Sequence, residues 1–186
     1  MTIEVLGSIG VGLLAGSFAL LAFGGDSLIE LISGLAVLRG LRGDSSRSSG
    51  NATDSRRTEQ FTSLLLFSLI PVIGLGAVYS YITGLKPEGS PLGIAIAIGA
   101  LIVMPYLYVQ KKRIGRETRS LSLSMDAIES ITCIFMATAL LGGLLAEYFL
   151  GFWWADYLAT GVILAFVARE ALESYHELHE EGAVHV

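Results

Sequence analysis

The stretch GSFALLAFGGDSLIELISGLAVLRGLR, residues 16–42, decides how this chain is expected to fold. It is long and apolar enough to cross a bilayer, which takes about 20 residues of α-helix. It nevertheless carries two carboxylates, Asp26 and Glu30, four residues apart. Because an α-helix turns once every 3.6 residues, both acids project from one face. An ionisable side chain is costly to hold at membrane depth, so this pair is a candidate functional site.

The composition of the whole chain indicates an integral membrane protein. Of its 186 residues, 53% are hydrophobic and 16% are charged, whereas soluble domains contain about 25% charged residues. The mean hydropathy is +0.65. This length accommodates six spans, so we expect an all-α membrane protein with six transmembrane helices in one domain, residues 1–178. The expected spans are about 3–15, 20–42, 59–84, 92–109, 121–148 and 155–171.

The connections between the spans differ in character. Residues 43–58 are rich in Ser, Gly and Asp and have no apolar period, so we expect a flexible cytoplasmic loop there. Residues 179–186 are expected to form a short cytoplasmic tail. The first connection has two possible places, at residues 23–25 or at Gly16 and Ser17. The second place is favoured because it buries the two acids further from the membrane surface.

The basic residues set the expected orientation. Ten of the 12 Lys and Arg fall in or beside the connections after the second and fourth spans. The positive-inside rule places these connections, and with them both termini, in the cytoplasm. We therefore expect a multi-pass protein of the cell (inner) membrane, with the lipid bilayer as a partner. Because topology accounts for the basic residues, nothing in the sequence indicates nucleic-acid binding.

The fifth expected span repeats the acidic pattern with Glu129 and Cys133, which are four residues apart and share a face. At a rise of 1.5 Å per residue, this pair and the Asp26–Glu30 pair all reach the middle third of the membrane. Two helices that each offer two ligands supply the four that a tetrahedral divalent ion requires. We therefore predict a metal site formed by Asp26, Glu30, Glu129 and Cys133.

Simpler interpretations of these residues stay open. A Cys in a membrane helix is often only a small apolar residue, so Cys133 could be structural. For Asp26 and Glu30 a purely structural role is harder to accept, because two anions on one face repel unless a cation or protons intervene. Metal ions and protons are therefore expected to compete for the site.

Other titratable residues are secondary candidates or have structural explanations. Asp126 is either an entrance ligand or a structural partner of a basic loop. His176 and His179 either collect metal at the inner mouth or belong to a solvated amphipathic tail. Asp156 is expected to cap the helix that it begins. Glu147 is expected at a span end, where water is available.

The two motifs resemble the transmembrane domain of the cation diffusion facilitator family, whose members are proton-coupled exporters of divalent metals. Residues 16–22 followed by Asp26 and Glu30 are similar to the second helix of that family, where two Asp four residues apart bind the ion. In the fifth helix, Glu129 stands at the position of a family His and Cys133 at that of a family Asp. All three substituted ligand positions retain a residue that can bind metal.

The resemblance extends to the sixth helix and also has limits. Residues 153–159 are similar to the start of that helix and residues 169–171 to its end. The His-Gly motif that often precedes the third helix is replaced by residues 53–56. Because the chain stops soon after the sixth span, we expect the cytoplasmic C-terminal domain of the family to be absent.

The resemblance implies a homodimeric transporter that works by alternating access and needs no organic cofactor. Carboxylates suit Mn and Fe as well as Zn, whereas the Cys133 thiolate favours Zn and would also accept Cd. Close-packing surfaces for the dimer are offered by Gly12, Gly16, Gly142 and Gly143. The sequence does not indicate an enzyme, since it shows no nucleophile beside a base. The alternative is a membrane metal sensor or partner subunit that binds metal without transport.

Overall fold

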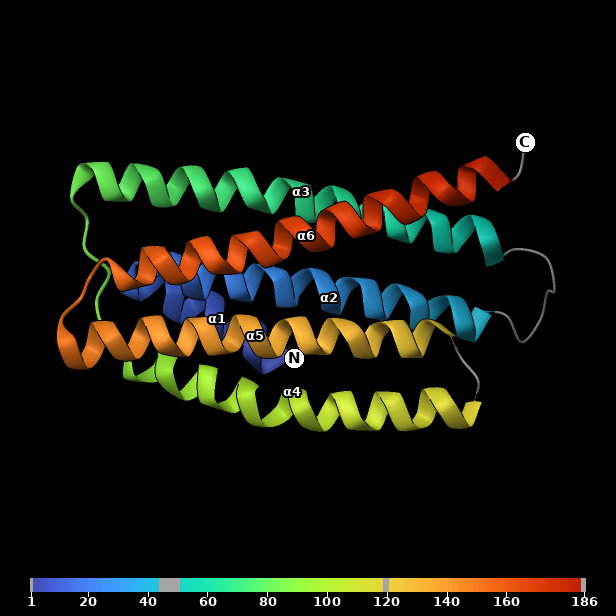
Figure 1. Ribbon diagram of the computed structural model, residues 1–186, viewed down its shortest axis with the longest axis horizontal. Coiled ribbons are helices and arrows are strands. Elements are labelled where there is room, and N and C mark those ends of the chain that lie inside the picture. Colours follow the sequence, from blue (N-terminus) through green and yellow to red (C-terminus); the bar gives the residue numbers. More distant parts are fainter. Residues whose placement is uncertain (1, 44–50, 119–120, 185–186) are drawn as a thin grey trace.

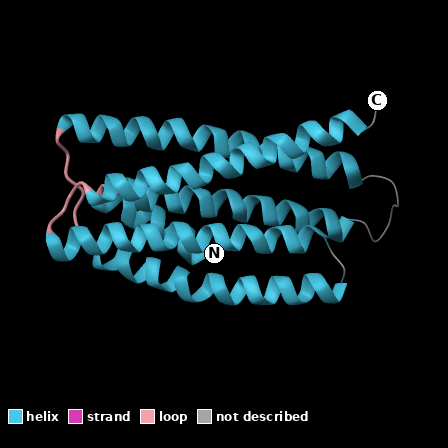
Figure 2. Ribbon diagram, viewed as in Figure 1, coloured by secondary structure: helices cyan, strands magenta, loops and turns pink. Residues whose placement is uncertain are grey.

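The computed structural model describes residues 2–43, 51–118 and 121–184, and the side chains of residues 2–32, 34–35, 63–114, 117 and 130–173. Within these residues the chain forms six helices that run along the length of one bundle (Figures 1 and 2). This is the all-α fold that the composition predicts. The helices are α1 (Thr2–Ala15), α2 (Phe18–Gly43), α3 (Asn51–Thr83), α4 (Pro91–Thr118), α5 (Leu121–Leu150) and α6 (Ala155–Val184).

Three helices extend well beyond the expected spans: α3 begins earlier, and α4 and α6 end later, with α4 reaching Thr118. The loop expected over residues 43–58 is wrong in its second half, because α3 already begins at Asn51. That segment lacks an apolar period, but Arg56, Arg57 and Gln60 are good helix formers. Residues 44–50 lie outside the described part of the chain. The expected tail at residues 179–186 is also helical as far as Val184.

One end of the bundle, here named the turn end, holds three tight connections (left in Figure 1). Each contains a glycine with positive φ: Gly16 at 66°, Gly84 at 73° and Gly151 at 68°. After the first of these, the Ser17 amide donates to the Gly12 carbonyl at 3.0 Å. This is the bond of a Schellman cap, which requires a left-handed residue. The turn between α1 and α2 therefore falls at Gly16 and Ser17.

The opposite end, here named the basic end, is where α2 and α4 finish and α3 and α5 begin. On α4 it carries Lys111, Lys112 and Arg113. The C-terminus lies at this end as well, whereas the short helix α1 starts part of the way along the bundle (Figure 1). The two ends therefore differ both in chain connections and in charge.

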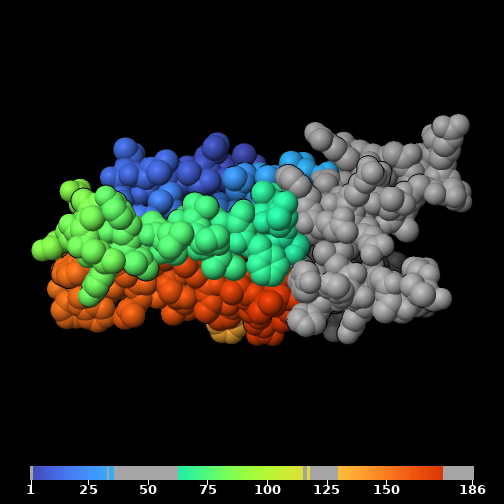
Figure 3. All heavy atoms as spheres, turned by 90° about the horizontal axis from the view of Figure 1, so that it is seen from above, coloured from blue at the N-terminus to red at the C-terminus, as the bar shows by residue number. Residues whose placement is uncertain are grey.

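Helix α2 is the centre of the bundle and packs against α1, α3, α5 and α6. Its first turns are sealed from the surface, since Ala19, Leu20, Ala22 and Phe23 are each at most 1% exposed. They form one hydrophobic core with residues of α5 and α6, among them Met136, Leu140, Leu144, Ile163 and Val167. On the face shown in Figure 3, α3 lies between α1 and α6 and covers this core.

Much of the outer surface that the described side chains form is apolar, which suits contact with lipid. Three helical segments among the described residues are long and apolar enough to cross a membrane: Ser63–Thr83, Pro91–Ile114 and Ser130–Leu150. Helix α1 is a shorter apolar helix. Many large apolar side chains on these helices point outward, including Leu75 and Ile102 at about 70% exposure.

Two of the glycines expected at a dimer surface instead pack inside the chain. A Cβ atom added at Gly12 would lie 3.0 Å from the Leu21 side chain of α2. One added at Gly143 would lie 2.7 Å from the Ala159 side chain of α6. The expectation was wrong for these two positions, because their lack of a side chain serves packing between helices of one chain. Around Gly16 and Gly142 the described residues leave open space.

A buried carboxylate of α6 holds the start of α2. The Asp156 side chain accepts the Ser17 hydroxyl at 2.5 Å and the Phe18 and Ala19 amides at 2.9 and 3.4 Å. The Ser17 oxygen in turn accepts the Leu20 amide at 3.1 Å. These amides belong to the first turn of α2, where an anion is favourable. Asp156 therefore caps α2, and the expectation that it caps its own helix was wrong.

We predict that Asp156→Ala destabilises the bundle by about 1–3 kcal/mol, because it leaves a buried hydroxyl and two amides without their acceptor. Asp156→Asn, which keeps one acceptor oxygen, should cost less. The measurement is thermal or denaturant unfolding of the purified protein in detergent. Glu88→Ala is a suitable control because this side chain is exposed. Equal stability of Asp156→Ala and the wild type would contradict the capping role.

Candidate metal site

Three of the four predicted ligands come together where α2 meets α5. Asp26 is 1% exposed and Cys133 is 2% exposed, while Glu30 is half-buried. The Cys133 thiol donates a hydrogen bond to Glu30 Oε1 at 2.8 Å. One ligand atom of each of the three residues lies within 4.8 Å of the other two. Ligands around a tetrahedral ion are about 3.5 Å apart, so small adjustments would let these three share one cation.

The depth of Asp26 is fixed by two glycines that precede it. A Cβ atom at Gly24 would lie 2.9 Å from the Ser8 side chain of α1, and one at Gly25 would lie 2.7 Å from Leu69 of α3. Helix α2 is therefore pressed closely against both neighbours at this level. Close packing on these two sides leaves the acid facing the bundle interior.

A lysine from the basic end approaches the same region of α5. Lys111 Nζ of α4 donates to Ser130 Oγ at 3.1 Å. Ser130 is buried and lies three residues before Cys133, on a similar face of the helix. Lys111 therefore contacts α5 about one helical turn before Cys133.

The remaining candidates lie in helices, but their side chains are outside the described residues. Glu129 and Asp126 are in α5, and His176 and His179 are in α6. The predicted fourth ligand, Glu129, is one helical turn from Cys133 along α5. The described cluster thus contains both acids of α2 and one ligand of α5.

Glu147 is buried, although its position near a span end predicted access to water. Its side chain is 6% exposed, and neither carboxylate oxygen has a hydrogen-bond partner among the described residues. Gly143, one turn earlier on α5, packs against Ala155 and Ala159 of α6. This close contact between the two helices buries the Glu147 side chain, and the expectation was wrong for that reason.

The sequence alone predicts no site role for Glu170 of α6, which lies close enough to Glu30 and Cys133 for their charges to interact. Its side chain is half-buried. Glu170 lies 14 residues, or two heptads, after Asp156, so the two acids share nearly the same face of α6. This spacing points to the acids of α2 only once Asp156 is known to face that helix.

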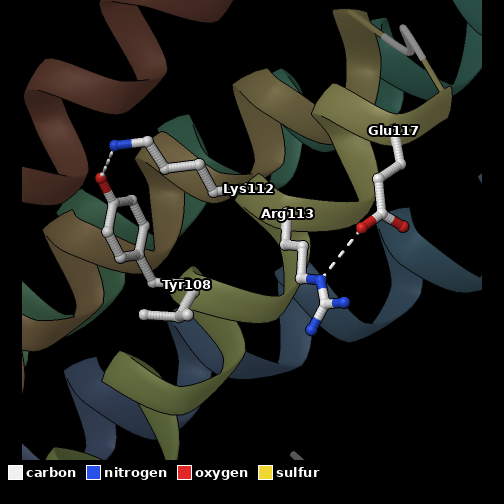
Figure 4. Close-up of a pocket in the computed structure, with 5 residues that line it drawn as sticks. Tyr108, Lys112, Arg113 and Glu117 are labelled. Atoms are coloured by element: carbon white, nitrogen blue, oxygen red, sulfur yellow. Dashed lines mark hydrogen bonds and ion pairs between the residues drawn. The ribbon is translucent and has the colours of Figure 1, made fainter.

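A hollow of about 470 Å³ on the outside of α4 is separate from the acid cluster. It is lined by Tyr108, Val109, Lys112, Arg113 and Glu117, all from this one helix (Figure 4). Lys112 Nζ donates to the Tyr108 hydroxyl at 2.6 Å, and Arg113 pairs with Glu117 at 3.0 Å. These polar groups are engaged with one another along the helix surface, so we assign the hollow no function.

The fold and the cluster define a class of protein, namely a helical membrane protein with carboxylate and thiol groups gathered between its helices. Residues 2–177 match the family described as the cation efflux transmembrane domain, and the chain belongs to this family. It is also 28% identical over 87 residues to the cation-efflux pump FieF of Shewanella oneidensis. That alignment covers 46% of this chain and 29% of the relative. The predicted family is thereby confirmed, and the chain is a membrane protein of a transporter family.

We predict that the Cys133 thiol resists alkylation in the folded protein, because its side chain is 2% exposed where α2 meets α5. Cys133 is the chain's single cysteine, so any label on the wild type reports this position. The measurement is the rate of maleimide labelling of the purified protein in detergent, by intact mass, before and after denaturation. Leu28→Cys is the control, since this side chain on α2 is 37% exposed and its added thiol should be labelled without denaturation. Labelling of Cys133 as fast in the folded as in the denatured protein would contradict the described packing of α2 on α5.

Proposed function

We propose that this protein exports a divalent transition-metal ion, which it binds between α2 and α5. The supporting observation is the convergence of Asp26, Glu30 and Cys133 within 4.8 Å in the interior of a cation efflux bundle. Glu129 is the proposed fourth ligand, and Asp126 a secondary acid on the same helix. His176 and His179 are proposed to collect metal near the basic end.

The proposed ligand set narrows the identity of the ion. Carboxylate oxygens from α2 suit Mn, Fe and Zn, whereas the thiolate of Cys133 adds preference for Zn and Cd. The thiol must lose its proton to coordinate a metal. Zn, Fe and Mn are therefore the proposed substrates, with Cd as an ion that the site would also accept.

Proton exchange follows from the same chemistry. The Cys133 thiol already gives its hydrogen to Glu30, and two neighbouring carboxylates of α2 are costly to hold charged together. An entering divalent ion displaces protons from these groups, and returning protons displace the ion. We infer a proton antiport by alternating access, in which the site opens first to one side and then to the other.

We propose that the protein lies in the cell (inner) membrane and that its basic end faces the cytoplasm. Lys111, Lys112 and Arg113 support this orientation, since basic residues favour the cytoplasmic side. Both termini would then be cytoplasmic. We further propose a homodimer that contacts through membrane helices, with the open surface around Gly142 of α5 as a close-packing position.

We predict that Asp26→Asn, Glu30→Gln and Glu129→Gln each reduce metal flux at least about tenfold, the scale of losses at perturbed metal sites. The assay uses protein in sealed liposomes that contain a metal-sensitive dye, with a pH dye to follow counter-movement of protons. Glu117→Gln is the control, since Glu117 is exposed and pairs with Arg113. Wild-type flux in all three variants would refute the proposal. Metal binding without flux in the wild type would instead identify a sensor or partner subunit.

We predict that Cys133→Ser changes metal preference more than it changes folding. Replacement of sulfur by oxygen should weaken Cd and Zn binding about tenfold or more, and Mn binding less than about threefold. Calorimetric titration of the purified protein with each metal measures the three affinities. If the Cys133 thiol serves only apolar packing, Cys133→Ala should leave all three affinities unchanged. That result would contradict its role as a metal ligand.

A further inference from the structure

Glu170 lies on α6, a helix outside the pair that forms the proposed site. Its position relative to that site follows from two independent helix contacts. The inference drawn from them rests on the proposed function, because it adds a residue to the same metal site.

The contact between α2 and α6 places Glu170 relative to Glu30. Both helices start at the turn end, where Asp156 binds the residues around Ser17. From Asp156 to Glu170 is 14 residues, or about 21 Å along a helix. From Ser17 to Glu30 is 13 residues, or about 20 Å. Glu170 and Glu30 therefore lie at nearly the same depth.

Glu170 also projects from the side of α6 that faces α2. Fourteen residues are about four turns less 40°, so Glu170 projects from nearly the same side as Asp156. Ile163, halfway between them, is 0% exposed. Since Asp156 faces α2, this stripe of α6 faces α2 as well. Arg169 and Glu173 pair with each other at 2.8 Å on an exposed part of the helix.

The contact between α5 and α6 places Glu170 relative to Cys133. The rings of Phe135 and Phe166 stack at 6.0 Å with an interplanar angle of 7°. The two helices run in opposite directions, so Cys133 and Glu170 both lie on the basic-end side of this stack. Along α5, Cys133 lies about 3 Å from Phe135 toward the basic end, and along α6, Glu170 lies about 6 Å from Phe166 in the same direction. Glu170 is thus about 3 Å nearer the basic end than the thiol.

The electrostatics of the site are consistent with this placement. The charge of Glu30 acts on Glu170, and the charge of Glu170 acts on Cys133. The Glu170 carboxylate stands outside the group of three residues whose ligand atoms lie within 4.8 Å. A glutamate has three rotatable side-chain bonds, so rotamer changes can bring its oxygen to an ion held by that group.

We propose that Glu170 is a metal-binding residue from a third helix, which supplies an oxygen to the ion on the side facing the basic end. The site then combines α2, α5 and α6 and holds an ion among carboxylates and one thiolate. A further oxygen favours Mn, Fe and Co over softer ions, so Glu170 also shifts selectivity. It is the first of these described acids that an ion entering from the basic end would meet.

The test uses Co(II) as the probe, titrated into the purified full chain in detergent. Glu170→Gln, which keeps the side-chain shape, should weaken Co(II) affinity at least about tenfold, as for other perturbed metal sites. Its sulfur-to-cobalt absorption band should persist, because Cys133 still binds, while the ligand-field bands change. Glu170→Asp should restore part of the affinity. Glu173→Gln, on the exposed side of the same helix, is the matched control and should stay within about twofold of wild type.

Affinity and ligand-field bands of Glu170→Gln equal to those of the wild type would overturn the inference and leave the proposed function intact. Equal effects of Glu170→Gln and Glu173→Gln would also overturn it, since only general surface charge would then be involved. Wild-type protein that binds no Co(II), or Asp26→Asn that binds it normally, would refute the proposed function itself. Unfolding temperatures without metal identify any variant that fails to fold.

Discussion

A carboxylate between membrane helices has no water to solvate it, so it must receive hydrogen bonds, hold a proton or face a cation. This constraint acts twice on α2. At the turn end the helix offers its own free amides, and Asp156 of α6 accepts them. Half-way along, Asp26 and Glu30 bring their charges to the interior beside the Cys133 thiol, a weak hydrogen-bond donor. The first arrangement is a set of hydrogen bonds within the protein, and the second is the one that we propose to hold an exchangeable ion.

Much of this arrangement could be predicted from periodicity and charge. The composition predicts a membrane bundle, and the 3.6-residue period puts Asp26 and Glu30 on one face. The spacing of these acids and of Cys133 also carries the family resemblance, which the match over residues 2–177 confirms. Such features are local in sequence, since each depends on residues within one or two helical turns. That is why the sequence of this one chain was enough to predict them.

Most of the features that could not be predicted depend on contacts between distant segments. Asp156 caps a helix whose first residue is 138 positions away, and nothing in its local sequence distinguishes this from capping its own helix. The burial of Glu147 and the inward packing of Gly12 and Gly143 depend on how neighbouring helices meet. The start of α3 was missed for a different reason, because a polar segment can be helical without an apolar face.

The bonds between Asp156 and the start of α2 have a mechanical consequence. Separation of α2 from α6 at the turn end would expose a buried carboxylate and two amides, whereas separation at the basic end breaks none of these bonds. Among the described residues, these bonds therefore fasten α2 to α6 at the turn end. A rearrangement of the bundle that keeps them would separate the two helices farthest at the basic end, and Asp26 and Glu30 lie between the two ends.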